Sequence, residues 1–316
     1  MELVGTCFVC SERNRRRDVY SKTSPSYGAG SAEVTGFYDV DTGSIQYLVV
    51  DPETRKAALI DAVLGFDPKS AVTDTSDIDA ILRFAEAEQV DIEWILDTHP
   101  HADHLMASDY LRNTLGKPNA IGAKVREIAE LWRDYYNLPD AFDPERDFDH
   151  LFDDGDTFTI GNLPVRVMLS PGHTLGSISY IVGDDAAFVH DTFMQPDAGT
   201  ARADFPGGTA LDLWNSLQDI LTLPDDTRLF VGHDYGTKWR PGPAWVSTVA
   251  EQRRHNSHIG GGVTQDAFIE LRESRDKTLA LPDRVIHVLQ MNLRAGRAPD
   301  AEADGNAYLK IPLNRF

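Results

Sequence analysis

The sequence contains little cysteine, with two in 316 residues, at Cys7 and Cys10. Two cysteines make no disulfide framework, which indicates a reducing compartment such as the cytoplasm. Their CxxC spacing is typical of redox or metal pairs, but no second CxxC and no βαβ pattern accompanies it. Free thiols in an N-terminal tail are therefore the simpler interpretation.

Positive charge and long apolar runs are also scarce. The chain has 30 Lys and Arg against 50 Asp and Glu, and its net charge is −20. Such a surface repels nucleic acid and anionic membranes, so neither is expected as a partner. No apolar run reaches the roughly 18 residues that a membrane helix needs. An anionic substrate would need arginine or lysine placed locally at its site.

Residues 1–31 differ in composition from the rest of the chain. Four arginines lie between positions 13 and 17, and Ser, Gly and Pro follow them. This composition predicts a flexible N-terminal extension before one domain at 32–316. Arginine and serine are also typical of mitochondrial transit peptides, which would place a eukaryotic chain in mitochondria, although acidic residues in the segment oppose this reading.

Strand and helix patterns alternate from residue 34 onward. Short apolar runs at 45–51 and 56–63 flank a turn and predict a pair of strands. Helical spacing follows at 75–89, and a buried strand is expected at 92–99. The alternation predicts an α/β domain built of layers.

The strand at 92–99 ends in a dense group of potential metal ligands. His99, His101, Asp103 and His104 fall within six residues. Residues two apart in extended backbone point to one face, which places His99 and His101 together. Imidazole suits zinc or iron, and carboxylate tolerates several metals. Further candidates follow other apolar runs, and loops at one sheet edge are where sites form. These candidates are His173, Asp191 and His233.

These stretches resemble the metallo-β-lactamase superfamily. Its HxHxDH motif reads here as HPHADH at 99–104, and SPGHT, HDT and VGHDY follow in the family's order. The resemblance implies a metallo-β-lactamase αβ/βα sandwich of two mixed β-sheets flanked by helices. It also implies a metal site at one edge of the sandwich.

Two stretches are similar to the persulfide (sulfur) dioxygenase branch, the ethylmalonic encephalopathy protein 1-like group. Ala102 stands where glyoxalase II-like hydrolases usually have a bulky aromatic residue, and 199–208 resembles the GxxRxDFxxG stretch of the dioxygenases. The resemblance implies one Fe(II) per chain, held by His99, His173 and Asp191. It implies oxidation of glutathione persulfide, or a similar persulfide, with O2 to sulfite and thiol.

The same resemblance suggests roles for further residues. Arg202 would bind the acidic part of the substrate, although a salt bridge with Asp204 is the alternative. Tyr235 and Lys238 are weaker candidates for substrate binding. His190 stands where the family usually has Gly, so a positive φ there would be strained. Relatives often form dimers, so a homodimer is expected as the oligomer. The groups around the iron ligands would be His101, Asp103, His104 and His233.

A dinuclear zinc hydrolase of thioesters or esters, like glyoxalase II, is the alternative function. It needs the same seven groups, so the ligand inventory does not separate it from the dioxygenase. Two Zn(II) per chain would lower the pKa of a shared water and provide hydroxide. A metal-dependent binding protein without turnover is the third hypothesis. In the hydrolase, one zinc would be held by His99, His101 and His173, the other by Asp103, His104 and His233, with Asp191 between them.

Overall fold

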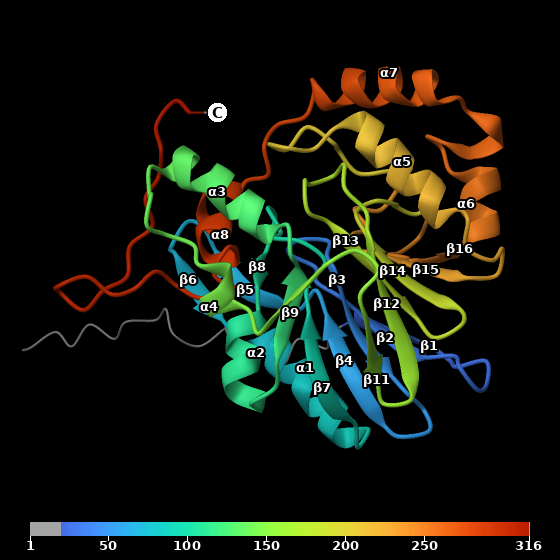
Figure 1. Cartoon of the computed structure of the whole chain (residues 1–316), viewed down its shortest axis with the longest axis horizontal. Helices are drawn as coiled ribbons and strands as arrows, with labels where there is room; N and C mark the ends of the chain where they lie inside the picture. The colour runs from blue at the N-terminus through green and yellow to red at the C-terminus, as the bar shows by residue number, and fades with distance from the viewer. Residues whose placement is uncertain (1–19, 316) are drawn as a thin grey trace, which may run out of the picture.

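The computed structural model describes residues 20–315. Two large sheets lie face to face in the centre of the molecule, and helices lie on their outer sides (Figure 1). A third, small sheet lies beside them. This is the predicted αβ/βα sandwich of two mixed sheets flanked by helices, so the predicted fold class is confirmed.

The first large sheet is mixed. Its first four strands pair antiparallel, and the pairs from the fourth strand onward are parallel. Every residue of its third strand is buried, and its one amide side chain, Gln46, accepts from the backbone of Val63 at 2.8 Å. In spatial order the strands are β1 (Tyr20–Ser24), β2 (Glu33–Tyr38), β3 (Ile45–Val50), β4 (Lys56–Ile60), β7 (Asp91–Leu96), β9 (Asn119–Gly122) and β10 (His150–Phe152).

Strand β1 corrects the predicted extent of the flexible extension. Tyr20 pairs with Tyr38 and Ser24 with Val34, so the sheet begins inside the segment 1–31. The sequence YSKTS is polar and lies at the sheet edge, where no apolar alternation is required. Residues 25–31 are also described, and Ser31 donates its hydroxyl to Asp185 at 2.9 Å. Residues 1–19, with Cys7, Cys10 and the basic cluster, lie outside the described residues.

The second large sheet is antiparallel except for the pairing of β14 with β15. The strand expected at 56–63 ends at Ile60, because Asp61 adopts a φ of 51° there, and its last residue, Val63, begins a strand of the small sheet. The second sheet contains β11 (Thr157–Ile160), β12 (Leu163–Leu169), β13 (Ile178–Val182), β14 (Ala186–His190), β15 (Arg228–Val231) and β16 (Val246–Thr248), and the small sheet contains β5 (Val63–Asp67), β6 (Val72–Asp74) and β8 (Leu105–Met106).

Helices cover both outer faces. The first two lie over the first sheet, and the later ones gather around the second sheet and the small sheet (Figure 1). None of the described helices is long and apolar enough to cross a membrane. They are α1 (Ser76–Ala87), α2 (Ser108–Leu115), α3 (Val125–Tyr136), α4 (Pro144–Asp147), α5 (Ala210–Ile220), α6 (Val249–His255), α7 (Gln265–Asp276) and α8 (Val285–Asn292), with a 3₁₀ turn at Gly260–Gly262.

The main core lies between the two sheets. Tyr47 of the first sheet packs against Phe188 and Phe230 of the second, with ring centroids 5.2 and 5.5 Å away. Phe188 and Phe230 stack on each other at 5.0 Å. This rigid aromatic cluster lies below the loops that follow β14 and β15, and it fixes the position of the side chains those loops supply.

Candidate metal centre

Four loops meet at one edge of the sandwich, and each follows the last residue of a strand. They come after β7, β12, β14 and β15. All seven predicted ligands lie on these loops, and all except Asp103 are buried. Because the interior rarely holds so many titratable groups unpaired, they must bind one another or a metal.

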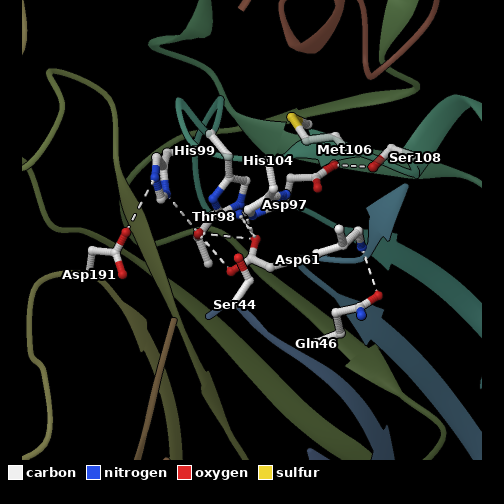
Figure 2. Close-up of polar contacts among 12 residues, drawn as sticks. Ser44, Gln46, Asp61, Asp97, Thr98, His99, His104, Met106, Ser108 and Asp191 are labelled. Atoms are coloured by element: carbon white, nitrogen blue, oxygen red, sulfur yellow. Dashed lines mark hydrogen bonds and ion pairs between the residues drawn. The ribbon is translucent and has the colours of Figure 1, made fainter. Parts of the chain in front are cut away.

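One group of three has the arrangement of a metal site. Ligand atoms of His99, His173 and Asp191 lie within 4.8 Å of one another. Asp191 Oδ2 is 3.4 Å from His173 Nε2 and 4.0 Å from His99 Nε2. Figure 2 shows His99 between Asp191 and Thr98.

The other ring nitrogens of both histidines fix their tautomers. Thr98 donates its hydroxyl to Asp61 at 2.9 Å, so its oxygen accepts from His99 Nδ1 at 3.0 Å (Figure 2). His173 Nδ1 donates to the carbonyl of Arg202 at 2.9 Å. Each Nε2 therefore keeps its lone pair and faces Asp191, which is how a histidine ligand is held toward a metal.

The charge states suit a cation. Burial lowers the pKa of His99 and His173, so both rings are neutral near pH 7. Burial alone would raise the pKa of Asp191, but the charge and hydrogen bond of His233 outweigh it and hold that pKa well below its usual range. Two neutral imidazoles and one carboxylate are a donor set that fits Fe(II) or Zn(II).

The other four predicted ligands do not all converge on a second metal site. Ligand atoms of His101, Asp103 and His104 also converge within 4.8 Å. His233 does not join them as a ligand, because its Nδ1 lies 2.6 Å from Asp191 Oδ1 and its Nε2 lies 2.6 Å from Asp103 Oδ2. These two carboxylates raise the pKa of His233 against the effect of burial. A doubly protonated ring has no lone pair for a metal.

The C-terminal helix α8 supports the HxHxDH loop. Asn292 is fully buried and donates to the carbonyls of His101 and His104 at 2.7 and 2.8 Å. Its carbonyl oxygen accepts from the backbone of Met106 at 2.9 Å. One side chain thus satisfies two carbonyls of the loop and one N–H of the following strand β8.

His190 has the backbone conformation that the missing glycine suggested. Its φ is 39°, which confirms the expected strain at this position. Its Nε2 lies 3.1 Å from Ser170 Oγ and 2.9 Å from Thr192 Oγ1, and its ring centroid is 5.2 Å from that of His99. These contacts hold the ring behind the ligand set.

A pocket of about 890 Å³ opens from this centre. His173, Asp191 and His233 line its inner end, and residues of α7 and of the link to α8 line its outer end. Phe205 packs edge-on against His173 at 5.3 Å, so the wall beside the ligands is apolar. This volume is typical of small-molecule sites.

The three predicted substrate-binding residues differ in their surroundings. Arg202 lines the pocket but donates to both carboxylate oxygens of Asp204, at 2.6 and 2.9 Å. Tyr235 also lines the pocket, is exposed, and stacks on His233 at 5.5 Å. Lys238 lies over the Trp239 ring at 4.5 Å. Arg202 thus forms the salt bridge with Asp204 that was the alternative to substrate binding. Substrate binding by Arg202, Tyr235 and Lys238 stays a prediction.

His258, in the pocket wall, predicts a loss of stability in acid. Its Nδ1 accepts from the backbone of Thr200 at 3.0 Å, and burial, with Arg272 and Arg275 nearby, lowers its pKa to about 4. The unfolded chain binds this proton near pH 6.5, before the folded chain does. The free energy of unfolding should therefore fall as the pH drops from about 6.5 toward about 4.

Urea unfolding of the metal-free protein at neutral and mildly acidic pH measures this effect. His258→Gln should reduce the difference in unfolding free energy between the two pH values. His255→Gln is the matched control, since His255 is exposed on α6. An equal acid loss in wild type and His258→Gln would contradict the assignment.

The comparisons with known proteins agree with this centre. The profile of the Metallo-beta-lactamase superfamily matches residues 40–233, more than half of the chain, and this stretch contains all seven candidate ligands. The chain belongs to the metallo-beta-lactamase superfamily. Members of the metallo-beta-lactamase superfamily are metal-dependent enzymes, and the His/Asp groups described above support a metal cofactor here.

Within this metallo-beta-lactamase superfamily the similarities point to two kinds of relative. The Beta-lactamase hydrolase-like protein of Xylella fastidiosa is 54% identical over 281 residues, which are 89% of this chain and 64% of that protein. The chain thus spans less than two thirds of that relative. The human mitochondrial Persulfide dioxygenase ETHE1 is 28% identical over 253 residues, 79% of this chain and 83% of that protein.

A solved structure supports the ETHE1-like branch. ETHE1 from Myxococcus xanthus is 30% identical, with a TM-score of 0.66, over 83% of this chain and 98% of that one. The predicted resemblance to the persulfide dioxygenase-like branch of the superfamily is confirmed.

Several residues of the centre were not among the predicted ones. Asp61 ends an apolar run like the predicted ligands do, so the same strand-end rule could have identified it. Thr98 precedes the motif, and its role depends on Asp61. No sequence pattern around Asn292 indicates its role, because the carbonyls it binds lie nearly two hundred residues earlier in the chain.

Proposed function

We propose that the chain is a persulfide dioxygenase that uses one Fe(II) to oxidise glutathione persulfide, or a similar persulfide, with O2. The observation that carries this proposal is the inequality of the two ligand groups. His99, His173 and Asp191 converge with their lone pairs free. His233, which a second metal would need, is held between Asp103 and Asp191.

Bound Fe(II) supplies the O2 chemistry, for which a set of two histidines and one carboxylate is typical. The net reaction converts one persulfide, one O2 and one water into one thiol, one sulfite and two protons. The chain's own residues hold the metal and exclude bulk water from the inner pocket. Phe205 provides part of that apolar wall, and the small Ala102 leaves room beside the motif.

A dinuclear zinc hydrolase of thioesters or esters remains the second candidate. His101 Nδ1 is buried and has no hydrogen-bond partner among the described residues, so this nitrogen is available to the zinc that His99, His101 and His173 would hold. The hydrolase-like name of the Xylella relative agrees with this candidate. The hydrolase would require His233 to lose a proton and to give up its contact with Asp103 or Asp191, so that one ring nitrogen can bind the second zinc.

Oxygen uptake by metal-reconstituted protein tests the proposal. Protein loaded anaerobically with Fe(II) should consume O2 when glutathione persulfide is added and release sulfite in equal amount. Zinc-loaded protein is the control and should consume none. Metal analysis should find one iron per chain.

The opposite result would favour the hydrolase. Protein verified to hold iron that takes up no O2, or a zinc form with two metals that cleaves a thioester, would replace the proposal by the second candidate. The homodimer and the cytoplasmic or mitochondrial location stay predictions of the sequence.

A further inference from the structure

The outer half of the pocket contains arginines that the metal centre does not use. Four line it: one lies on the wall beside the ligands, two lie on α7, and one lies in the link 277–284. That link descends from the end of α7, at the top of Figure 1, to α8. The four are Arg202, Arg272, Arg275 and Arg284.

Two of these arginines are committed to partners in the protein. Arg202 holds Asp204 with two hydrogen bonds and donates a third to the carbonyl of Ala280 at 2.6 Å. Arg272 is buried, with an ion pair to Asp276 at 2.6 Å and a hydrogen bond to the carbonyl of Thr200 at 3.0 Å. Because their donors are satisfied, neither has a strong reason to bind a substrate.

The other two have no such partners. Within residues 20–315, neither Arg275 nor Arg284 forms a side-chain hydrogen bond or an ion pair. Nε of Arg284 is buried without an acceptor. Asp283 lines the same region but is not ion-paired with either guanidinium within the described range.

An unmade hydrogen bond at a buried donor is costly, so the Arg284 site is incomplete without an acceptor. The surrounding chain could readily have provided one, because acidic residues outnumber basic ones by 50 to 30. Two unpaired guanidinium groups in a strongly acidic protein, at the open end of the reaction pocket, form a local anion site. The planar guanidinium binds carboxylates with paired hydrogen bonds.

We propose that Arg275 and Arg284 bind the carboxylates of a substrate with two acidic groups, whose sulfur lies at the inner end of the pocket. The sulfur chemistry rests on the proposed function, but the acidic recognition does not. A tripeptide-sized thiol such as glutathione has two carboxylates and suits a pocket of about 890 Å³. The recognition role expected for Arg202 and Lys238 thereby passes to these two arginines.

Calorimetric titration of the anaerobic, metal-loaded protein tests this assignment. The probes are glutathione and its diethyl ester, which has the same thiol but no carboxylates. Wild type should bind glutathione more tightly than the ester. Arg284→Gln should weaken glutathione binding about tenfold, because a charge-assisted hydrogen bond at a partly buried donor is lost. Arg275→Gln should weaken it less, since Arg275 is exposed.

Arg254→Gln provides the matched control. Arg254 lies exposed on α6, outside the pocket, so this variant removes the same charge without touching the site. Its glutathione affinity should equal that of wild type. The affinity of every variant for the diethyl ester should stay within about twofold of wild type, because no carboxylate is present to lose a partner.

Equal losses for glutathione and ester, no difference between Arg284→Gln and Arg254→Gln, or no preference of wild type for glutathione would overturn the proposal. The titration needs no oxygen and no turnover, so its result is independent of the reaction. A selective loss in Arg284→Gln without oxygen uptake by the iron protein would keep the acidic site and reject the dioxygenase. Oxygen uptake by the iron protein without a selective loss of glutathione binding in Arg284→Gln would keep the dioxygenase and reject the acidic site.

Discussion

Asp191→Ala is expected to lose bound metal and metal-dependent turnover while the protein stays folded. Asp191 is the only carboxylate of the three-residue set and lies between His99 and His173. Loss of a direct ligand should lower metal affinity by more than about a hundredfold, since changes in outer partners already cost ten- to a hundredfold. His233 keeps Asp103 as its partner, so its charge is not left alone in the interior.

Metal content after dialysis, together with circular dichroism, measures this outcome. Asp226→Ala is the matched control, because Asp226 is exposed on a loop away from the pocket. His99→Ala should behave as Asp191→Ala does. Retention of stoichiometric metal and turnover in both ligand variants would reject the assigned centre.

Asn292→Leu is expected to cost both stability and metal affinity. The substitution leaves two carbonyls of the HxHxDH loop and the N–H of Met106 without their partner. Each unsatisfied buried group costs about 1–3 kcal/mol, so the free energy of unfolding should fall by about 3 kcal/mol or more. The loop should also hold His101 and His104 less firmly, which weakens any metal that depends on it.

Gln290→Leu separates these two effects. Gln290 lies on the same helix and is likewise buried, but its side chain binds the backbone of Lys310 instead of the metal loop. Urea unfolding of the metal-free proteins should show that both variants are destabilised. Metal titration should show a weakened affinity in Asn292→Leu alone, and equal affinities would show that Asn292 acts only on stability.

The sequence predicted those parts of the centre whose cause is local. His99, His173, Asp191 and His233 each follow an apolar strand, and a strand end fixes where such a side chain lies. The strain at His190 was expected from the family resemblance, because the family usually has Gly at this position. The position of a ligand at a strand end depends on a few neighbouring residues, so the sequence alone can predict it.

Other parts depend on contacts between distant segments. Arg202 also donates to the carbonyl of Ala280, 78 residues later in the chain, and no local pattern indicates this contact. Strand β1 has no apolar pattern, and only its pairing with β2 makes it a strand. The support from Asn292 spans 188 residues to His104, a separation that no local pattern indicates.

That separation has a consequence during synthesis. The HxHxDH loop leaves the ribosome long before Asn292 does, and at 5–20 residues per second the interval is roughly 10 to 40 seconds. Throughout this time the carbonyls of His101 and His104 lack the side chain that will hold them. The histidines of the nascent chain are therefore exposed to metal ions before the contacts that fix their loop can form. Selective loading requires that the metal binds after folding, or that other metal ions are kept from the unfolded chain.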